Sequence, residues 1–135
     1  MKHTNSTAVC VRCEKMLDEG HPDLRKSFAE IRKTYPDVHV SCVYRGKEAQ
    51  NKAVQDKLSK TPWPKSKHNA LQDGKPCSLA MDLFRLGDDG KAYFPMDFYA
   101  MIANLATILR LPLVWGGSWK MVDGPHFQLK EKSKS

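Results

Sequence analysis

An aspartate within an apolar strand pattern constrains the fold of this chain more than any other feature. Residues 78–86 place Leu79, Met81 and Leu83 on one side and Asp82 on the other, with the two-residue period of a β-strand. A carboxylate among apolar neighbours must face solvent or be paired, because burying it without a partner is costly. The pattern therefore predicts a strand with one apolar face and one face that carries a polar group.

Helix and strand patterns occupy much of the remaining chain. Three helices are predicted, over residues 21–35, 47–58 and 97–110. Four further strands are predicted, over residues 38–44, 92–94, 113–115 and 126–129. Asp97 is expected as the N-cap of the last helix. Because helices and strands are mostly segregated along the chain, we expect an α+β fold with a central antiparallel sheet and packed helices.

The length of 135 residues predicts a single small domain that does not need disulfides to hold its core. We expect the folded domain over residues 21–129. Residues 1–20 show little periodicity and are expected as an N-terminal extension. Residues 130–135 are rich in lysine and serine and are expected as a basic, frayed tail.

The formal net charge of +7 favours an anionic partner. Nucleic acid, an anionic membrane surface and an acidic cell-wall polymer all meet that description. The basic residues are spread along the chain and form no recognition helix or aromatic platform, so we expect no specific nucleic-acid partner. No apolar run reaches membrane-spanning length, and residues 1–7 lack the apolar core of a secretory signal. We therefore expect the protein to be made and at first kept in a reducing cytoplasm.

The four cysteines are Cys10, Cys13, Cys42 and Cys77. Cys10 and Cys13 have the Cys-x-x-Cys spacing of a zinc knuckle or a redox pair. A knuckle needs a second pair of ligands, and Cys42 and Cys77 lie far apart in the sequence. A thioredoxin-like redox motif would follow a strand, and no strand clearly precedes Cys10. Ordinary thiols in a reducing compartment are the favoured interpretation, and a structural metal bound by Cys10 and Cys13 is the alternative.

Two histidines and a second acid accompany Asp82 as candidates for a metal site. Each of His68, Asp82 and His126 is by itself compatible with an ordinary surface position, but together they supply three zinc ligands and leave a fourth position for water. Zinc lowers the pKa of its bound water to about 7, and a nearby carboxylate must then accept the proton. Asp123 precedes His126 by one short turn, which predicts an acid beside the metal that is not itself a ligand.

These motifs resemble those of the zinc-dependent peptidoglycan peptidases, a family that includes VanY-type D-Ala-D-Ala carboxypeptidases and phage L-alanyl-D-glutamate endolysins. The family motif is Ser-x-His, then Ala-x-Asp on the next strand, then a later acid-x-x-His. The matching segments here are Ser66-Lys67-His68, Ala80-Met81-Asp82 and Asp123-Gly124-Pro125-His126. Tyr44-Arg45-Gly46 with Gln50 resembles the arginine segment of the family. The resemblance covers roughly residues 21–129, which makes this range a zinc peptidase domain.

The resemblance implies His68, Asp82 and His126 as ligands of Zn²⁺ and Asp123 as the catalytic base. It implies that Arg45 holds a substrate carboxylate or stabilises the developing oxyanion, because a guanidinium is a rigid fork of donors.

Ser66 and Trp115 are candidate substrate-binding residues of the cleft, Trp115 together with Trp119. A serine that caps the loop and a tryptophan that packs in the core are the alternative interpretations. One departure from the family lies between His68 and Asp82, where a longer connection contains Cys77, a thiol that would be able to compete for zinc.

The resemblance implies a monomeric zinc metallopeptidase that cuts a stem-peptide bond of bacterial peptidoglycan, as a phage-type L-alanyl-D-glutamate endopeptidase does. Such an enzyme would act on the cell wall after release from the cytoplasm by a separate factor. One alternative is a D-Ala-D-Ala carboxypeptidase. The other is a non-enzymatic, metal-stabilised module that binds cell wall or nucleic acid.

Overall fold

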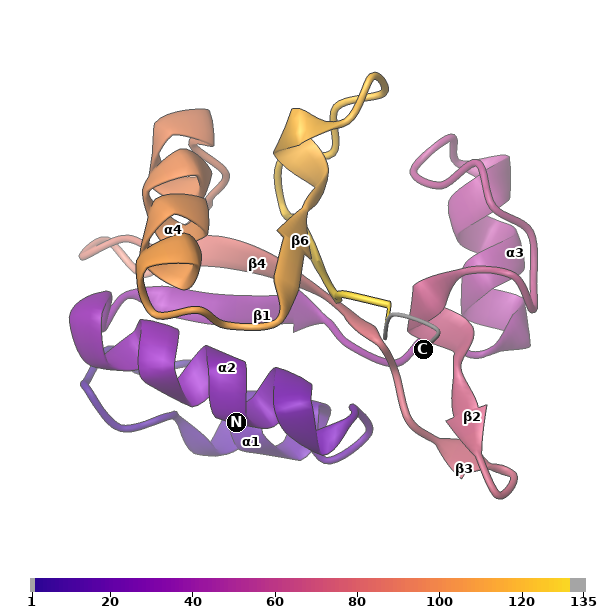
Figure 1. Cartoon of the computed structure of the whole chain (residues 1–135), viewed down its shortest axis with the longest axis horizontal. Helices are drawn as coiled ribbons and strands as arrows, with labels where there is room; N and C mark the ends of the chain where they lie inside the picture. The colour runs from indigo at the N-terminus through magenta and orange to yellow at the C-terminus, as the bar shows by residue number, and fades with distance from the viewer. Residues whose placement is uncertain (1, 132–135) are drawn as a thin grey trace.

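A computed structural model describes residues 2–131 of the chain (Figure 1). Its centre is a five-stranded antiparallel sheet. Four strands lie side by side in the order β1 (Val38–Cys42), β4 (Ala80–Leu86), β7 (His126–Leu129) and β6 (Leu113–Trp115). The short β5 (Ala92–Tyr93) pairs with the end of β4. Together with the helices, this sheet confirms the predicted α+β fold.

Four α-helices accompany the sheet in the described part of the chain. They are α1 (Val11–Leu17), α2 (Pro22–Thr34), α3 (Lys47–Gln55) and α4 (Met96–Ile108). In Figure 1, α1, α2 and α4 lie toward one end of the sheet and α3 lies apart at the other end. The helix predicted after His21 is confirmed: the His21 ring accepts a hydrogen bond from the amide of Asp23, and Pro22 occupies the first turn.

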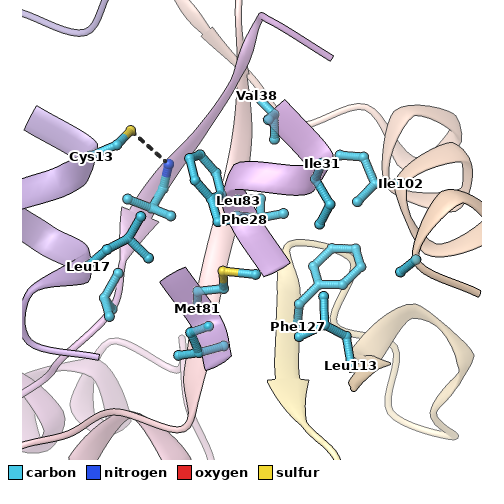
Figure 2. Close-up of a cluster of buried hydrophobic side chains, with 14 of the residues drawn as sticks. Cys13, Leu17, Phe28, Ile31, Val38, Met81, Leu83, Ile102, Leu113 and Phe127 are labelled. Carbon is cyan, nitrogen blue, oxygen red and sulfur yellow. Dashed lines mark hydrogen bonds between the residues drawn. The ribbon is translucent and has the colours of Figure 1, made fainter. Parts of the chain in front are cut away.

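The hydrophobic core collects side chains from the sheet and from α1, α2 and α4 (Figure 2). Met81 and Leu83 of β4 are fully buried in it, as the strand pattern predicts. They pack with side chains of the neighbouring elements, among them Leu17, Phe28, Ile31, Ile102 and Phe127. The face of β4 that carries Met81 and Leu83 is therefore covered, and Asp82 lies on the opposite face between the buried Ala80 and Phe84.

Several local features differ from the prediction. The segment before His21 contains the helix α1, whose Cys13 and Leu17 are fully buried in the same core. The connection after His68 contains a hairpin of β2 (Leu71–Gln72) and β3 (Lys75–Pro76). Its turn places Asp73 and Gly74 at positive φ, as a two-residue hairpin of type I′ requires.

Two strand and helix boundaries also change. β1 ends at Cys42 and not at residue 44, because the pairing with β4 shifts register between Val40 and Cys42. The prediction that Asp97 caps α4 is wrong: Pro95 is the N-cap residue, and Asp97 lies in the first turn, where its carboxylate accepts from the amide of Phe98.

Two further expectations concern the C-terminal tail and membrane-spanning segments. The frayed tail was predicted for residues 130–135, of which 132–135 lie outside the described residues. Among residues 2–131, no helix combines the length and the apolar character that crossing a membrane requires.

Candidate metal centre

Asp82 lies on β4, between β1 and β7, at the centre of a row of polar residues. Its direct partners in register are Cys42 on β1 and His126 on β7. Residues that face each other across antiparallel strands project to the same side of the sheet. The sheet therefore brings these side chains together, although 40 residues or more separate Asp82 from either partner in sequence.

His68 reaches this row from a short 3₁₀ turn, η1 (Lys67–Asn69). Ser66 caps the turn: its hydroxyl accepts from the amide of His68 at 3.2 Å, and the side-chain oxygen of Asn69 accepts from the amide of Ser66 at 3.1 Å. The turn is fastened beyond the end of β1 because the amide of Arg45 donates to the carbonyl of His68 at 2.9 Å. The segment Ser66-Lys67-His68 thus forms a capped turn that presents a buried histidine.

The Asp82 carboxylate joins the two histidines. Its Oδ1 atom lies 3.3 Å from Nε2 of His68 and 3.3 Å from Nδ1 of His126. Zinc–ligand distances of about 2.0–2.1 Å at a tetrahedral angle place neighbouring ligand atoms about 3.3 Å apart. The Asp82 oxygen therefore has ligand spacing to each of the two nitrogens, and Asp82 links the two histidines.

The contacts of the other ring nitrogen of each histidine indicate which nitrogen carries a proton. Nδ1 of His68 lies 2.8 Å from the carbonyl of Val43, and Nε2 of His126 lies 2.9 Å from the amide oxygen of Gln128. Both partners only accept, so each of these nitrogens carries the proton and donates. Nε2 of His68 and Nδ1 of His126 consequently face Asp82: here they hydrogen-bond to its carboxylate, and the same two nitrogens, when deprotonated, are the ones that would bind a metal.

Arg45 and Asp123 flank the carboxylate at the centre. Nη2 of Arg45 lies 3.6 Å from Oδ2 of Asp82, and its Nη1 donates to Oε1 of Gln50 at 3.1 Å. Oδ2 of Asp123 lies 3.9 Å from Nδ1 of His126, and the Asp123 side chain is about half exposed, at 48%. Asp123 thus lies beside His126, at the edge of the group of candidate ligands.

The protonation of the group reflects burial and mutual contact. Burial by itself lowers the pKa of His68, but hydrogen bonds to Asp82 and Cys42 outweigh it and raise that pKa. Burial raises the pKa of Asp82, while hydrogen bonds from His126 and His68 outweigh it and hold the pKa well below its usual range. Burial and the Asp82 charge raise the pKa of Asp123. The charges therefore favour an ionised Asp82 ready to pair with a cation, and a proton-accepting Asp123 beside it.

Cys42 is the residue near this centre that the sequence analysis did not single out. Its sulfur lies 3.8 Å from Nδ1 of His68 and receives a hydrogen bond from Nη2 of Arg45 at 3.5 Å. With His68 and Asp82 it forms a group whose ligand atoms lie within 4.8 Å of one another. The Cys77 thiol instead contacts Gln72 of the β2–β3 hairpin. The sequence feature that could have placed Cys42 near this centre is its position at the end of the strand that leads to Arg45.

The two tryptophans near the centre have different surroundings. Trp115 stacks on Phe127 and donates through Nε1 to the carbonyl of Gly124 at 2.7 Å, which braces the turn between Asp123 and His126. Trp119 is partly exposed, with its ring centre 5.1 Å from that of His126. Trp119 is therefore the tryptophan whose ring lies against a candidate ligand.

The fold is similar to that of a solved structure, the L-Ala D-Glu endopeptidase ChiX of Serratia marcescens. The TM-score is 0.69 and the sequence identity is 29%, and the similarity covers 89% of this chain and 87% of ChiX. No family model matches the sequence, and no curated protein does. The likeness to ChiX thus extends over most of the chain.

Proposed function

We propose that this protein is a zinc metallopeptidase that hydrolyses the L-alanyl–D-glutamate bond in peptidoglycan stem peptides. The observation that carries the proposal is that Oδ1 of Asp82 lies 3.3 Å from a ring nitrogen of both His68 and His126, with Asp123 beside His126. The similarity to an L-Ala D-Glu endopeptidase supports the choice of bond. The net charge of +7 favours approach to an anionic cell wall.

In this mechanism His68, Asp82 and His126 hold the zinc ion, which when bound polarises the scissile carbonyl and makes water a nucleophile at neutral pH. Asp123 accepts the proton of the attacking water and delivers it to the leaving amine. The pKa of Asp123, raised by burial and by Asp82, suits a group that must both take up and release a proton.

Arg45 holds the oxygen of Asp82 that does not contact the histidines. Its contacts with Asp82 and Gln50 keep the guanidinium fork at the edge of the centre, where it is positioned for a substrate carboxylate or for the oxyanion of the transition state. The proposal places the enzyme at the cell wall as a monomer, after release by a separate factor.

Digestion of purified peptidoglycan by the zinc-loaded protein, followed by mass analysis of the fragments, tests the proposal. We expect stem peptides that begin at D-glutamate, loss of activity with a chelator, and recovery when zinc is returned. Products that lack only a terminal D-alanine would identify a carboxypeptidase instead. Activity that a chelator leaves intact would refute the zinc mechanism, and zinc binding without any cleavage would favour a binding module.

A further inference from the structure

A second group of metal-ligating side chains lies outside the candidate catalytic centre. It consists of His3 in the N-terminal segment, Cys10 and Cys13 at the start of α1, and His39 on β1. One ligand atom from each residue lies within 4.8 Å of all the others. Cys10, Cys13 and His39 are buried, and His3 is partly buried. The Cys-x-x-Cys motif therefore does have a second pair of ligands, and this pair consists of histidines.

The distances within the group are those of a tetrahedral zinc site. Cys10 Sγ lies 3.5 Å from Nδ1 of His3 and 3.6 Å from Nδ1 of His39. Cys13 Sγ lies 3.4 Å from each of the same two nitrogens. Zinc–sulfur bonds of about 2.3 Å and zinc–nitrogen bonds of about 2.0–2.1 Å at a tetrahedral angle separate sulfur from nitrogen by about 3.6 Å. All four sulfur–nitrogen distances agree with this value to within 0.2 Å.

Hydrogen bonding between thiols and imidazoles does not account for this pattern equally well. Two thiols have two protons to donate, yet four sulfur–nitrogen contacts are present. No disulfide joins these sulfurs, since Cys10 and Cys13 are both free. A single ion at the centre of the four atoms would satisfy every contact at once.

The surroundings orient the ligands toward the centre of the group. Nε2 of His39 lies 2.8 Å from Oδ1 of Asn5, which can only accept, so His39 is protonated at Nε2 and offers its Nδ1 lone pair to the sulfurs. The amide of Val40 donates to Cys13 Sγ at 3.5 Å (Figure 2). These supporting bonds match the way in which neighbouring groups hold metal-bound histidines and thiolates.

Arg32 holds the segment that carries His3 in place. Its buried guanidinium donates to the carbonyls of Thr4 and Ser6 in that segment and to the carbonyl of Val38 on β1. Nη1 of Arg32 also lies 3.4 Å from Nδ1 of His39, so the guanidinium contacts both the segment and one of the four grouped residues. The group of His3, Cys10, Cys13 and His39 is thus assembled from contacts among residues that are far apart in the sequence.

We propose that His3, Cys10, Cys13 and His39 bind a structural zinc ion. Its four protein ligands leave no open position, which distinguishes it from the three-ligand catalytic centre. The ion would join the N-terminal segment and α1 to β1, the strand that leads to Cys42 and Val43, both of which contact His68. This second site does not depend on the proposed peptidase activity.

Cobalt substitution separates the two sites, because a thiolate bound to Co²⁺ produces a charge-transfer band in the near ultraviolet and the proposed catalytic ligands include no sulfur. We expect this band in the full-length wild-type protein and in His126→Ala. We expect it to lose at least half of its intensity in Cys13→Ser, which removes one of the two thiolates, and to persist at full intensity in the matched controls Cys42→Ser and Cys77→Ser. The zinc content should fall from two ions per chain to one in His126→Ala.

If Cys13→Ser does not fold, the cobalt spectrum of the wild-type protein and the reactivity of its thiols test the proposal instead. In the zinc-loaded protein, Cys10 and Cys13 should resist a thiol reagent until a chelator removes the metal. A folded wild-type protein without the cobalt band, or with the band retained at full intensity in Cys13→Ser, would overturn the proposal. So would a chain mass that is two hydrogens low with no metal bound, because that result indicates a Cys10–Cys13 disulfide.

Discussion

Replacement of Gln128 tests whether the contacts around the histidines tune the catalytic zinc. Gln128 touches the proposed metal centre only through Nε2 of His126, at 2.9 Å, and it lies beside that residue on β7. Gln128→Leu removes the acceptor and keeps the size of the side chain. His126 remains as a candidate ligand, but its Nε2 then loses the acceptor that helps to orient the ring. Losing such a supporting contact lowers metal affinity roughly 10–100-fold, or about 1.4–2.7 kcal/mol.

The assay is the free zinc concentration that restores half of the peptidoglycan hydrolysis, measured in zinc buffers. We expect this concentration to rise roughly 10–100-fold in Gln128→Leu, with the maximal rate largely recovered at high zinc. Gln128→Glu keeps an acceptor at the same position and should remain close to wild type. An unchanged zinc requirement in folded Gln128→Leu would refute the reasoning, and so would an equal loss in Gln128→Glu.

Three further substitutions test the base, the core and a close backbone contact. Asp123→Asn should lower hydrolysis roughly 10²–10⁴-fold while the zinc content is unchanged; a variant that retains activity would exclude Asp123 as the base. Leu83→Ala should lower the free energy of unfolding in urea by about 2–5 kcal/mol, because Leu83 is fully buried, whereas Leu58→Ala at an exposed position should change it by less than about 0.5 kcal/mol. Gly116→Ala should destabilise the protein by about 1–3 kcal/mol and reduce activity, because a Cβ there would lie 2.5 Å from the carbonyl of Asp123. Gly46→Ala is its control, since a Cβ at that position meets nothing closer than 3.8 Å; equal effects of the two substitutions would contradict this account.

Local patterns were sufficient for the elements that have a strong period or a clear boundary. The helix after His21, the strand with Asp82 and the strand that begins at His126 are all present in the structure. Each has a repeating apolar side, which burial in one core explains. The hairpin after His68 and the helix α1 were missed, because α1 is only about two turns long and neither segment shows the alternation or helical spacing that identified the other elements.

The two metal groups differ in how much of each could be predicted. The motifs that contain His68, Asp82 and His126 identified three residues that the structure brings together, since both histidines contact the same carboxylate oxygen of Asp82. Cys42 could not be placed there, because its position opposite Asp82 depends on the register shift in β1. The ligand set itself stays a prediction until metal is measured.

The sequence by itself determined the chemistry that is available to this protein: a carboxylate on a core strand, histidines and an acid in family-like order, and a Cys-x-x-Cys pair. Only the tertiary structure decided which of these groups meet. His3 and His39 join Cys10 and Cys13 in one group of potential metal ligands. No spacing rule connects the histidines to the cysteines, because the packing of the N-terminal segment against β1 determines how close these residues lie. Side-chain type is a property of one position, whereas a metal site requires atoms within a few ångströms, and strand register and loop packing establish that proximity.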